Sequence, residues 1–186
     1  MIASTDRVLD IGCGFCHFLN NVSAASRTGV DANPAAAKFA GAGVRFISTA
    51  DLSMAELNGE HFDFVFLSNF LEHLSSSDDV LQLLRRIRKL ISPNGRLVIL
   101  QPNFRLLGWR YFDFIDHKTI LTDANVQEAL ECTGFSVSDK IVRFLPYTTK
   151  SRLPLDPWLV RVYLKFPIAQ RILGKQSLFV AVPADE

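Results

Sequence analysis

Residues 8–16 read VLDIGCGFC, and the pattern of this segment indicates how the rest of the chain folds. An apolar run ends in the carboxylate of Asp10, glycines then alternate with small or apolar residues, and a helical pattern begins. We interpret the stretch as a buried strand, a tight turn and a helix N-terminus. Gly12 and Gly14 lack a Cβ, so a ligand can lie against bare backbone. Unpaired N–H groups together with the charge of Asp10 suit a ligand that carries both a carboxylate and an ammonium group.

The stretch resembles motif I of the class I S-adenosylmethionine (SAM) dependent methyltransferases, in which an acidic residue precedes Gly-x-Gly-x-Gly; Cys16 stands at the third glycine position. In that family the loop wraps the methionine part of SAM. The resemblance implies an α/β, Rossmann-like fold: a mostly parallel seven-stranded sheet with an antiparallel last strand and helices on both faces. It covers nearly the whole chain, which we interpret as one domain, 1–186. Family members commonly carry helices before the first strand, so here we expect a lid from elsewhere or a truncated chain.

Length, charge and cysteine content narrow the class. A chain of 186 residues can form one domain with a substantial core. A formal net charge of +1 argues against a nucleic-acid binder, whose footprint would be strongly basic. The sequence shows neither a signal peptide nor an apolar run of the ~20 residues that a membrane span needs. Three cysteines cannot form a paired disulfide framework, so we expect a cytoplasmic protein.

Hydrophobic periodicity predicts alternating strands and helices. The clearest helix is 79–91, whose apolar residues repeat at helical spacing, and 92–95 is expected to stop it. Strands separated by helices imply right-handed crossovers and a parallel sheet. Besides 8–11, the predicted strands are 28–31, 44–47, 62–67, 96–100, 135–143 and 177–182, and the other predicted helices are 17–25, one opening at Asn33-Pro34, and 125–132 ending at Gly134.

Further cofactor positions follow the early strands. Asp31 ends the second strand, where a carboxylate can accept both hydroxyls of a ribose, at the spacing that βαβ geometry sets. The resemblance assigns ribose binding to this position and to its neighbour Ala32. It likewise matches Asp51, with Leu52, to the residue that meets the adenine amino group; otherwise Asp51 caps a short helix.

The segment SNFLEHL, residues 68–74, resembles the family segment that passes beneath the methionine moiety and faces the acceptor. It implies that Asn69 holds the cofactor and that Glu72 and His73 serve as base. In some relatives these two are metal ligands, but those relatives have an acid where Asn69 stands, so we expect no metal. The alternative is a loop in which His73 is merely packed or solvated.

An aromatic-rich loop, 109–117, follows the fifth strand at the edge where open α/β sheets bind ligands. Asp116 beside His117 can orient an imidazole as a general base, although adjacent residues need not face each other. His117 is the first candidate base and His73 the second. The alternative is that the aromatics cover the sheet edge and His117 is a hydrogen-bonded structural residue.

Residues 144–175 form a basic, aromatic insertion between the last two strands. Asp156-Pro157 predicts a helix start, with an apolar face formed by Trp158, Leu159, Val162, Tyr163 and Phe166. Either it is a lid or packing helix, or it contacts an anionic membrane or a lipid-linked glycan. The segments RFLPY, 143–147, and GKQS, 174–177, resemble uncharacterised bacterial methyltransferases associated with glycan synthesis.

Three other interpretations compete. A nicotinamide site would need a small residue where His17 stands, and Asp10 would repel a pyrophosphate. Redox chemistry at Cys13-x-x-Cys16 would need a thioredoxin-like strand–helix order, and zinc lacks a second ligand pair. A noncatalytic SAM-fold module acting with a partner protein stays open. We expect SAM-dependent methyl transfer to an oxygen or nitrogen of a small molecule or glycan precursor.

Overall fold

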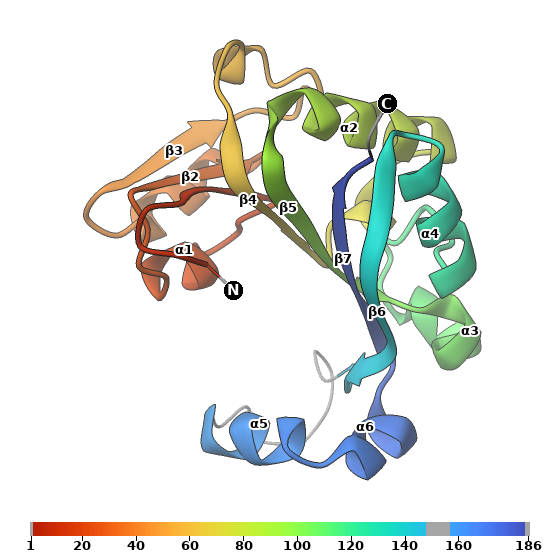
Figure 1. The fold of residues 1–186 in the computed structure, drawn as a ribbon. Helices are drawn as coiled ribbons and strands as arrows, with labels where there is room; N and C mark the ends of the chain where they lie inside the picture. Colours follow the sequence, from red (N-terminus) through yellow and green to blue (C-terminus); the bar gives the residue numbers. More distant parts are fainter. Residues whose placement is uncertain (1, 148–156, 185–186) are drawn as a thin grey trace.

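A computed structural model describes residues 2–147 and 157–184. Seven strands form one sheet in the order β3-β2-β1-β4-β5-β7-β6 (Figure 1). Strands β1 to β5 pair in parallel, and β7 runs antiparallel to both β5 and β6. The predicted sheet and its antiparallel last strand are confirmed. The strands are β1 (Arg7–Ile11), β2 (Ser26–Asp31), β3 (Val44–Ser48), β4 (Phe62–Ser68), β5 (Ile91–Pro102), β6 (Phe135–Leu145) and β7 (Gln176–Pro183).

Helices cover the two faces of the sheet unequally. Helices α2 (Ser77–Leu90) and α4 (Asp123–Glu131) pack on one face and bury the larger core with β1, β4 and β5. On the other face α1 (His17–Asn20) buries a smaller cluster that includes Cys13, Cys16 and Leu19. The shorter elements are the 3-10 helices η1 (Pro34–Phe39), η2 (Ala55–Leu57), η3 (Leu71–His73) and η4 (Gly108–Asp113), and the helix α3 (Phe104–Leu107).

The helix predicted over 17–25 is wrong in its extent, because α1 ends at Asn20. Two asparagine side chains form hydrogen bonds to backbone at this end: Asn21 Nδ2 donates to the carbonyl of His17, which lies within α1, at 2.8 Å. Asn20 Nδ2 donates to the carbonyl of Phe39, also at 2.8 Å. Such local bonds disfavour helix interiors. A four-residue helix has little dipole, so the ligand cradle is the loop before it.

The predicted stop at 92–95 lies inside a strand. Helix α2 ends at Leu90 and β5 begins at the next residue, with Ile91 opposite Phe62 and Arg96 opposite Phe64 across an irregularity in the ladder. Ser92 holds this stretch extended, since its hydroxyl donates to Asp63 Oδ1 at 2.8 Å. The helix predicted over 125–132 spans Asp123–Glu131 and opens on a capping box between Thr122 and Asn125.

The insertion forms two helices, α5 (Pro157–Leu164) and α6 (Pro167–Leu173). Figure 1 shows them apart from the helices that cover the sheet. The predicted N-cap Asp156 lies outside the described residues. Helix α6 was not predicted, although Pro167 at its first position is a start signal. Within the described ranges, every helix is too short or too polar to cross a bilayer.

Candidate functional site

A cavity of about 470 Å³ opens where β1 to β4 end. Its volume falls within the range typical of small-molecule sites. Loops that follow four neighbouring strands supply its wall. Six residues predicted for the site line it: Gly12, Asp31, Ala32, Asp51, Leu52 and His73. Four other residues predicted for the site do not line this cavity: Asp10, Gly14, Asn69 and His117.

The loop after β1 is held by β2 and relies on left-handed backbone. The N–H groups of Gly12 and Cys13 both donate to the carbonyl of Val30, at 2.8 and 3.1 Å. Gly12 has φ +73°, and a Cβ there would overlap the ring of Phe70. Gly14 has φ +48° and open space where a Cβ would point. Cys16 has φ +55°, so the third glycine position of the motif keeps the glycine-like conformation without the glycine.

Asp31 joins this loop to the end of β2. Its Oδ2 accepts from the N–H of Gly14 and its Oδ1 from the N–H of Asn33, both at 2.8 Å. Each carboxylate oxygen keeps a second acceptor site, so the group can also accept from two vicinal hydroxyls at the cavity. The position predicted for ribose binding therefore has its carboxylate fixed by backbone.

Asp10 is a buried acid without a donor. Its side chain is 3% exposed, and none of the described residues donates a hydrogen bond to it. Burial, followed by the negative charge of Asp31, raises the pKa of Asp10 to about 7. A cationic ligand beside it would favour the ionised form again. This environment suits an ammonium or sulfonium group and opposes a phosphate.

Asp51 and Asn69 have local partners as well as their predicted roles. The backbone N–H and the hydroxyl of Ser53 donate to the exposed carboxylate of Asp51, and these bonds lower its pKa. Asn69 sits at φ +49°, and its Oδ1 accepts from Gln176 Nε2 at 2.7 Å. Asn69 thus fixes the end of β4 to β7, and it does not line the cavity.

A second cluster of polar side chains consists of Glu72, His73 and His117, and its member His73 lines the cavity. Glu72 is fully buried, and its Oε2 accepts from Gln101 Nε2 at 2.9 Å. Its Oε1 has no hydrogen-bond partner within the described residues. The Nε2 atoms of His73 and His117 each lie 3.9 Å from this oxygen. Burial raises the pKa of the Glu72 carboxyl.

Asp116 orients His73 rather than its sequence neighbour. Nδ1 of His73 lies 3.3 Å from Asp116 Oδ2 and 3.2 Å from the Asp116 carbonyl oxygen. The pairing of Asp116 with His117 is therefore wrong. A turn closed by the N–H of His117 and the carbonyl of Phe114 at 3.3 Å separates the two adjacent side chains. No pattern in the sequence reveals the Asp116–His73 pair.

His117 lies inside an aromatic cage. Its side chain is 2% exposed, and its ring stacks on Phe114 with centroids 5.2 Å apart. The rings of Tyr111 and His117 are T-shaped with centroids 4.8 Å apart, and the Tyr147 hydroxyl lies 3.4 Å from His117 Nε2. Burial, followed by the charge of His73, lowers the pKa of His117, so the neutral imidazole is favoured. Sequence reasoning gave Tyr147 no role at the site, although this residue ends the segment 143–147 that was singled out for its resemblance.

The Cys13–Cys16 pair does not have the properties of a redox centre. The two sulfur atoms lie 3.8 Å apart, and both residues are buried. Burial raises the pKa of both thiols, whereas a redox-active Cys-x-x-Cys needs a lowered thiol pKa. The thiols pack in the smaller core beneath α1.

Comparisons with known proteins concern most of the chain. The profile of a family described as a methyltransferase domain matches residues 2–140. No curated protein matches. Three solved structures of SAM-dependent methyltransferases have a similar fold. The structure from Archaeoglobus fulgidus has 24% identity and a TM-score of 0.68, and the match covers 95% of this chain and 86% of that one. The structure from Mesorhizobium loti has 20% identity and a TM-score of 0.67, and the match covers 95% of this chain and 90% of that one. The structure from Methanosarcina mazei has 15% identity and a TM-score of 0.71, and the match covers 100% of this chain and 95% of that one.

Proposed function

The chain belongs to the methyltransferase-domain family, and from this premise we propose that it transfers the methyl group of SAM to an oxygen or nitrogen atom of a small molecule or glycan precursor. One observation carries the proposal: Asp31 and His73 line the same cavity. A group suited to a ribose therefore shares a wall with a group suited to accept a proton. The glycan part draws on the resemblance of 143–147 and 174–177 to methyltransferases associated with glycan synthesis.

The cofactor would be held by the residues around the cavity. Asp31, beside Ala32, would accept the ribose hydroxyls, and Asp51 with Leu52 would meet the adenine. The backbone at Gly12 and Gly14 would receive the methionine part, with Asp10 facing its ammonium group. Asn69 would act indirectly, by fixing the end of β4 through Gln176. Bound SAM supplies an electrophilic methyl group on a sulfonium.

The protein's contribution would be alignment, exclusion of water and, where the acceptor must lose a proton, a base. His117 remains the first candidate for that base, because its lowered pKa keeps the imidazole neutral. His73, which Asp116 orients and which reaches the cavity wall, is the second. If His117→Ala and His73→Ala each keep full turnover, positioning alone carries the reaction.

Calorimetric titration with SAM and S-adenosylhomocysteine, with NAD as a control ligand, tests the proposal. We expect micromolar binding of both sulfur ligands, loss of at least a hundredfold in Asp31→Ala, and no change in Asp139→Ala, an exposed aspartate on β6. Absence of binding would overturn the proposal. Binding without transfer to any of a panel of hydroxyl and amine acceptors would favour the noncatalytic module.

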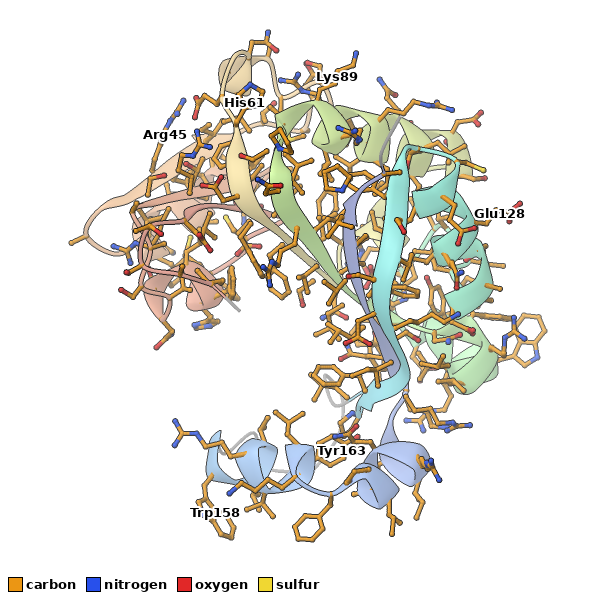
Figure 2. All side chains as sticks on the ribbon, in the orientation of Figure 1. Arg45, His61, Lys89, Glu128, Trp158 and Tyr163 are labelled. Atoms are coloured by element: carbon orange, nitrogen blue, oxygen red, sulfur yellow. The ribbon has the colours of Figure 1, made fainter. Side chains whose placement is uncertain are left out.

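We further propose that α5 and α6 bring the protein to an anionic membrane surface, where a lipid-linked glycan would be found. Trp158, Phe166, Ile168 and Ile172 are 66%, 58%, 73% and 68% exposed. In Figure 2 Trp158 points away from the molecule, whereas Tyr163 points toward the sheet. The Tyr163 hydroxyl donates to the carbonyl of Phe144 at 2.8 Å and anchors α5 at the end of β6. Three exposed cations accompany this apolar surface: Arg161, Lys165 and Arg171.

Apolar side chains beside basic ones on short helices are the composition of a helix that lies in a membrane interface. Co-sedimentation with anionic and neutral vesicles tests this. We expect binding to the anionic vesicles at low salt and its loss in the double variant Trp158→Ser, Ile168→Ser. Trp109→Ser is the matched control, because Trp109 is 84% exposed but lies in η4, outside α5 and α6. No binding to anionic vesicles at low salt would remove the membrane proposal.

A further inference from the structure

We propose that Glu72, His73 and His117 bind a divalent transition-metal ion, with zinc the best match. One ligand-type atom from each of the three residues lies within 4.8 Å of the other two. The residues come from η3, which follows β4, and from the loop after η4. The sequence alone predicted no metal, because Asn69 stands where metal-binding relatives have an acid.

The spacing of the three groups fits an ion better than direct hydrogen bonds. Both imidazole Nε2 atoms lie 3.9 Å from Glu72 Oε1, beyond the range of 2.7–3.2 Å for a hydrogen bond. A tetrahedral zinc ion with bonds of about 2.0–2.1 Å separates its ligand atoms by about 3.4 Å. Each imidazole would have to approach Glu72 Oε1 by about 0.5 Å, and the most distant pair of ligand atoms, up to 4.8 Å apart, would have to approach by up to about 1.4 Å.

Two atoms of the cluster, Glu72 Oε1 and His117 Nε2, have poorly satisfied hydrogen-bonding capacity. Glu72 Oε1 is fully buried and lacks a hydrogen-bond partner within the described residues. A buried carboxylate oxygen without a partner is costly, and native proteins rarely leave one. The neighbouring His117 Nε2 has only the Tyr147 hydroxyl, at the long distance of 3.4 Å. An ion between these atoms would satisfy both.

The outer contacts are those of metal ligands. A ligating histidine usually gives its other ring nitrogen to a carboxylate or carbonyl, which fixes the ring. Nδ1 of His73 has both partners in Asp116, while its Nε2 faces Glu72. Gln101 holds the other oxygen of Glu72 at 2.9 Å. Two of the three ligands are thus already oriented.

The donor set indicates the ion and its task. Two imidazoles and one carboxylate favour zinc and its neighbours over magnesium or calcium, and three protein ligands leave a fourth position open. Of the three ligands only His73 lines the cavity, so we place the open position on the His73 side, where an acceptor oxygen would enter. This task, binding the acceptor and favouring its deprotonated form, would replace the imidazole base of the proposed function, because a ligating imidazole nitrogen cannot accept a proton. The task rests on the proposed function, whereas the metal site does not.

Cobalt(II) titration of the chelator-treated chain, followed by visible absorption and displaced with zinc, tests the site. We expect one cobalt per chain with the bands of a tetrahedral ion and no thiolate-to-cobalt band. His73→Ala should weaken binding at least a hundredfold, and Asp116→Asn by about 10–100-fold. Both residues are partly exposed, so both variants should fold. His61→Ala is the control, because His61 lies at the opposite end of β4 (Figure 2).

Three results would overturn the proposal: no cobalt bound at millimolar concentration, a thiolate band that assigns the ion to Cys13 and Cys16, or equal affinity in the parent chain, His73→Ala and Asp116→Asn. Circular dichroism of each variant separates loss of the site from loss of the fold. SAM titration of the same samples separates the two proposals, since intact SAM binding without cobalt binding removes only the metal.

Discussion

Asp10 and Asp63 lie on adjacent strands, near opposite ends of the sheet, in contrasting surroundings. Asp63, near the start of β4, accepts from Arg7 Nε at 3.0 Å, from the Arg7 N–H at 2.9 Å and from the Ser92 hydroxyl at 2.8 Å. These bonds hold the pKa of Asp63 well below its usual range. Asp10, near the end of β1, has no donor within the described residues, and its pKa is raised to about 7.

The difference separates a structural acid from a functional one. At the edge of the sheet where β4 begins, Arg7 and Ser92 donate hydrogen bonds to Asp63, and the ionised form of Asp63 therefore stabilises the fold. At the carboxyl edge the chain keeps a charge that the fold disfavours, beside glycines that expose backbone. Groups with strongly perturbed pKa values in clefts are typical of functional sites. The contrast predicts opposite stability effects when each aspartate is neutralised.

The largest expected effect is a gain in stability in Asp10→Asn. The folded pKa of about 7 exceeds the unfolded value, so the stability contributed by protonated Asp10 is present near pH 4 and lost as the pH rises through 7. The asparagine side chain of the variant does not titrate, so the variant does not lose this stability as the pH rises. Near pH 8 we expect Asp10→Asn to exceed the parent by about 2–4 kcal/mol in the free energy of unfolding, measured by urea denaturation.

The comparison would break if Asp10→Asn were less stable than the parent near pH 8, since Asp10 would then have an undetected structural partner. Near pH 4 the two proteins should unfold at similar urea concentrations, because both carry a neutral group at this position. Agreement at low pH combined with a difference at high pH therefore identifies the charge, rather than the shape of the side chain, as the cause.

Much of the fold was predictable because its signals are local. An apolar run, a turn with glycines and an acid at the strand end are read within a few residues, and βαβ geometry fixes the spacing to Asp31. The errors in extent, such as the end of α1, arose where Asn20 and Asn21 formed side-chain bonds that periodicity does not register. Helix α6 needed only the start signal of Pro167.

The second half of the site was less predictable because its contacts are long-range. His73 and His117 were recognised as residue types, yet the fold pairs Asp116 with His73 and not with His117. Glu72 accepts from Gln101 on β5 and lies 3.9 Å from His117, which follows η4, so both neighbours come from distant segments. A single sequence contains no spacing rule for such an arrangement.

A smaller effect should appear in ligand affinity. If Asp10 faces the cationic part of SAM, binding requires the ionised acid. Because its pKa is about 7, the apparent affinity should fall by up to about tenfold for each pH unit below that value and stay constant above it. Calorimetry between about pH 5 and pH 8 measures this slope. The slope should vanish in Asp10→Asn; an unchanged slope there would assign it to another group.

The smallest effect should be the loss of stability in Asp63→Asn. The folded pKa is depressed, so the contribution of Asp63 is present above its unfolded pKa, near 4, and is lost as the pH falls toward the folded value. Near pH 7 we expect a loss of about 1 kcal/mol, because both partners are partly exposed, and a smaller difference near pH 3. Urea denaturation at the two pH values measures it.

Glu60→Gln is the matched control, because Glu60 pairs with Arg45 at 2.7 Å on an exposed surface and, within the described residues, accepts no hydrogen bond from a hydroxyl. An exposed pair of this kind contributes about 0.5 kcal/mol or less. Equal losses in the two variants would mean that the Ser92 hydroxyl and the Arg7 N–H add nothing, and Asp63 would be an ordinary surface ion pair. A larger loss in Asp63→Asn would instead mark the start of β4 as the edge where charge serves stability, in contrast to Asp10.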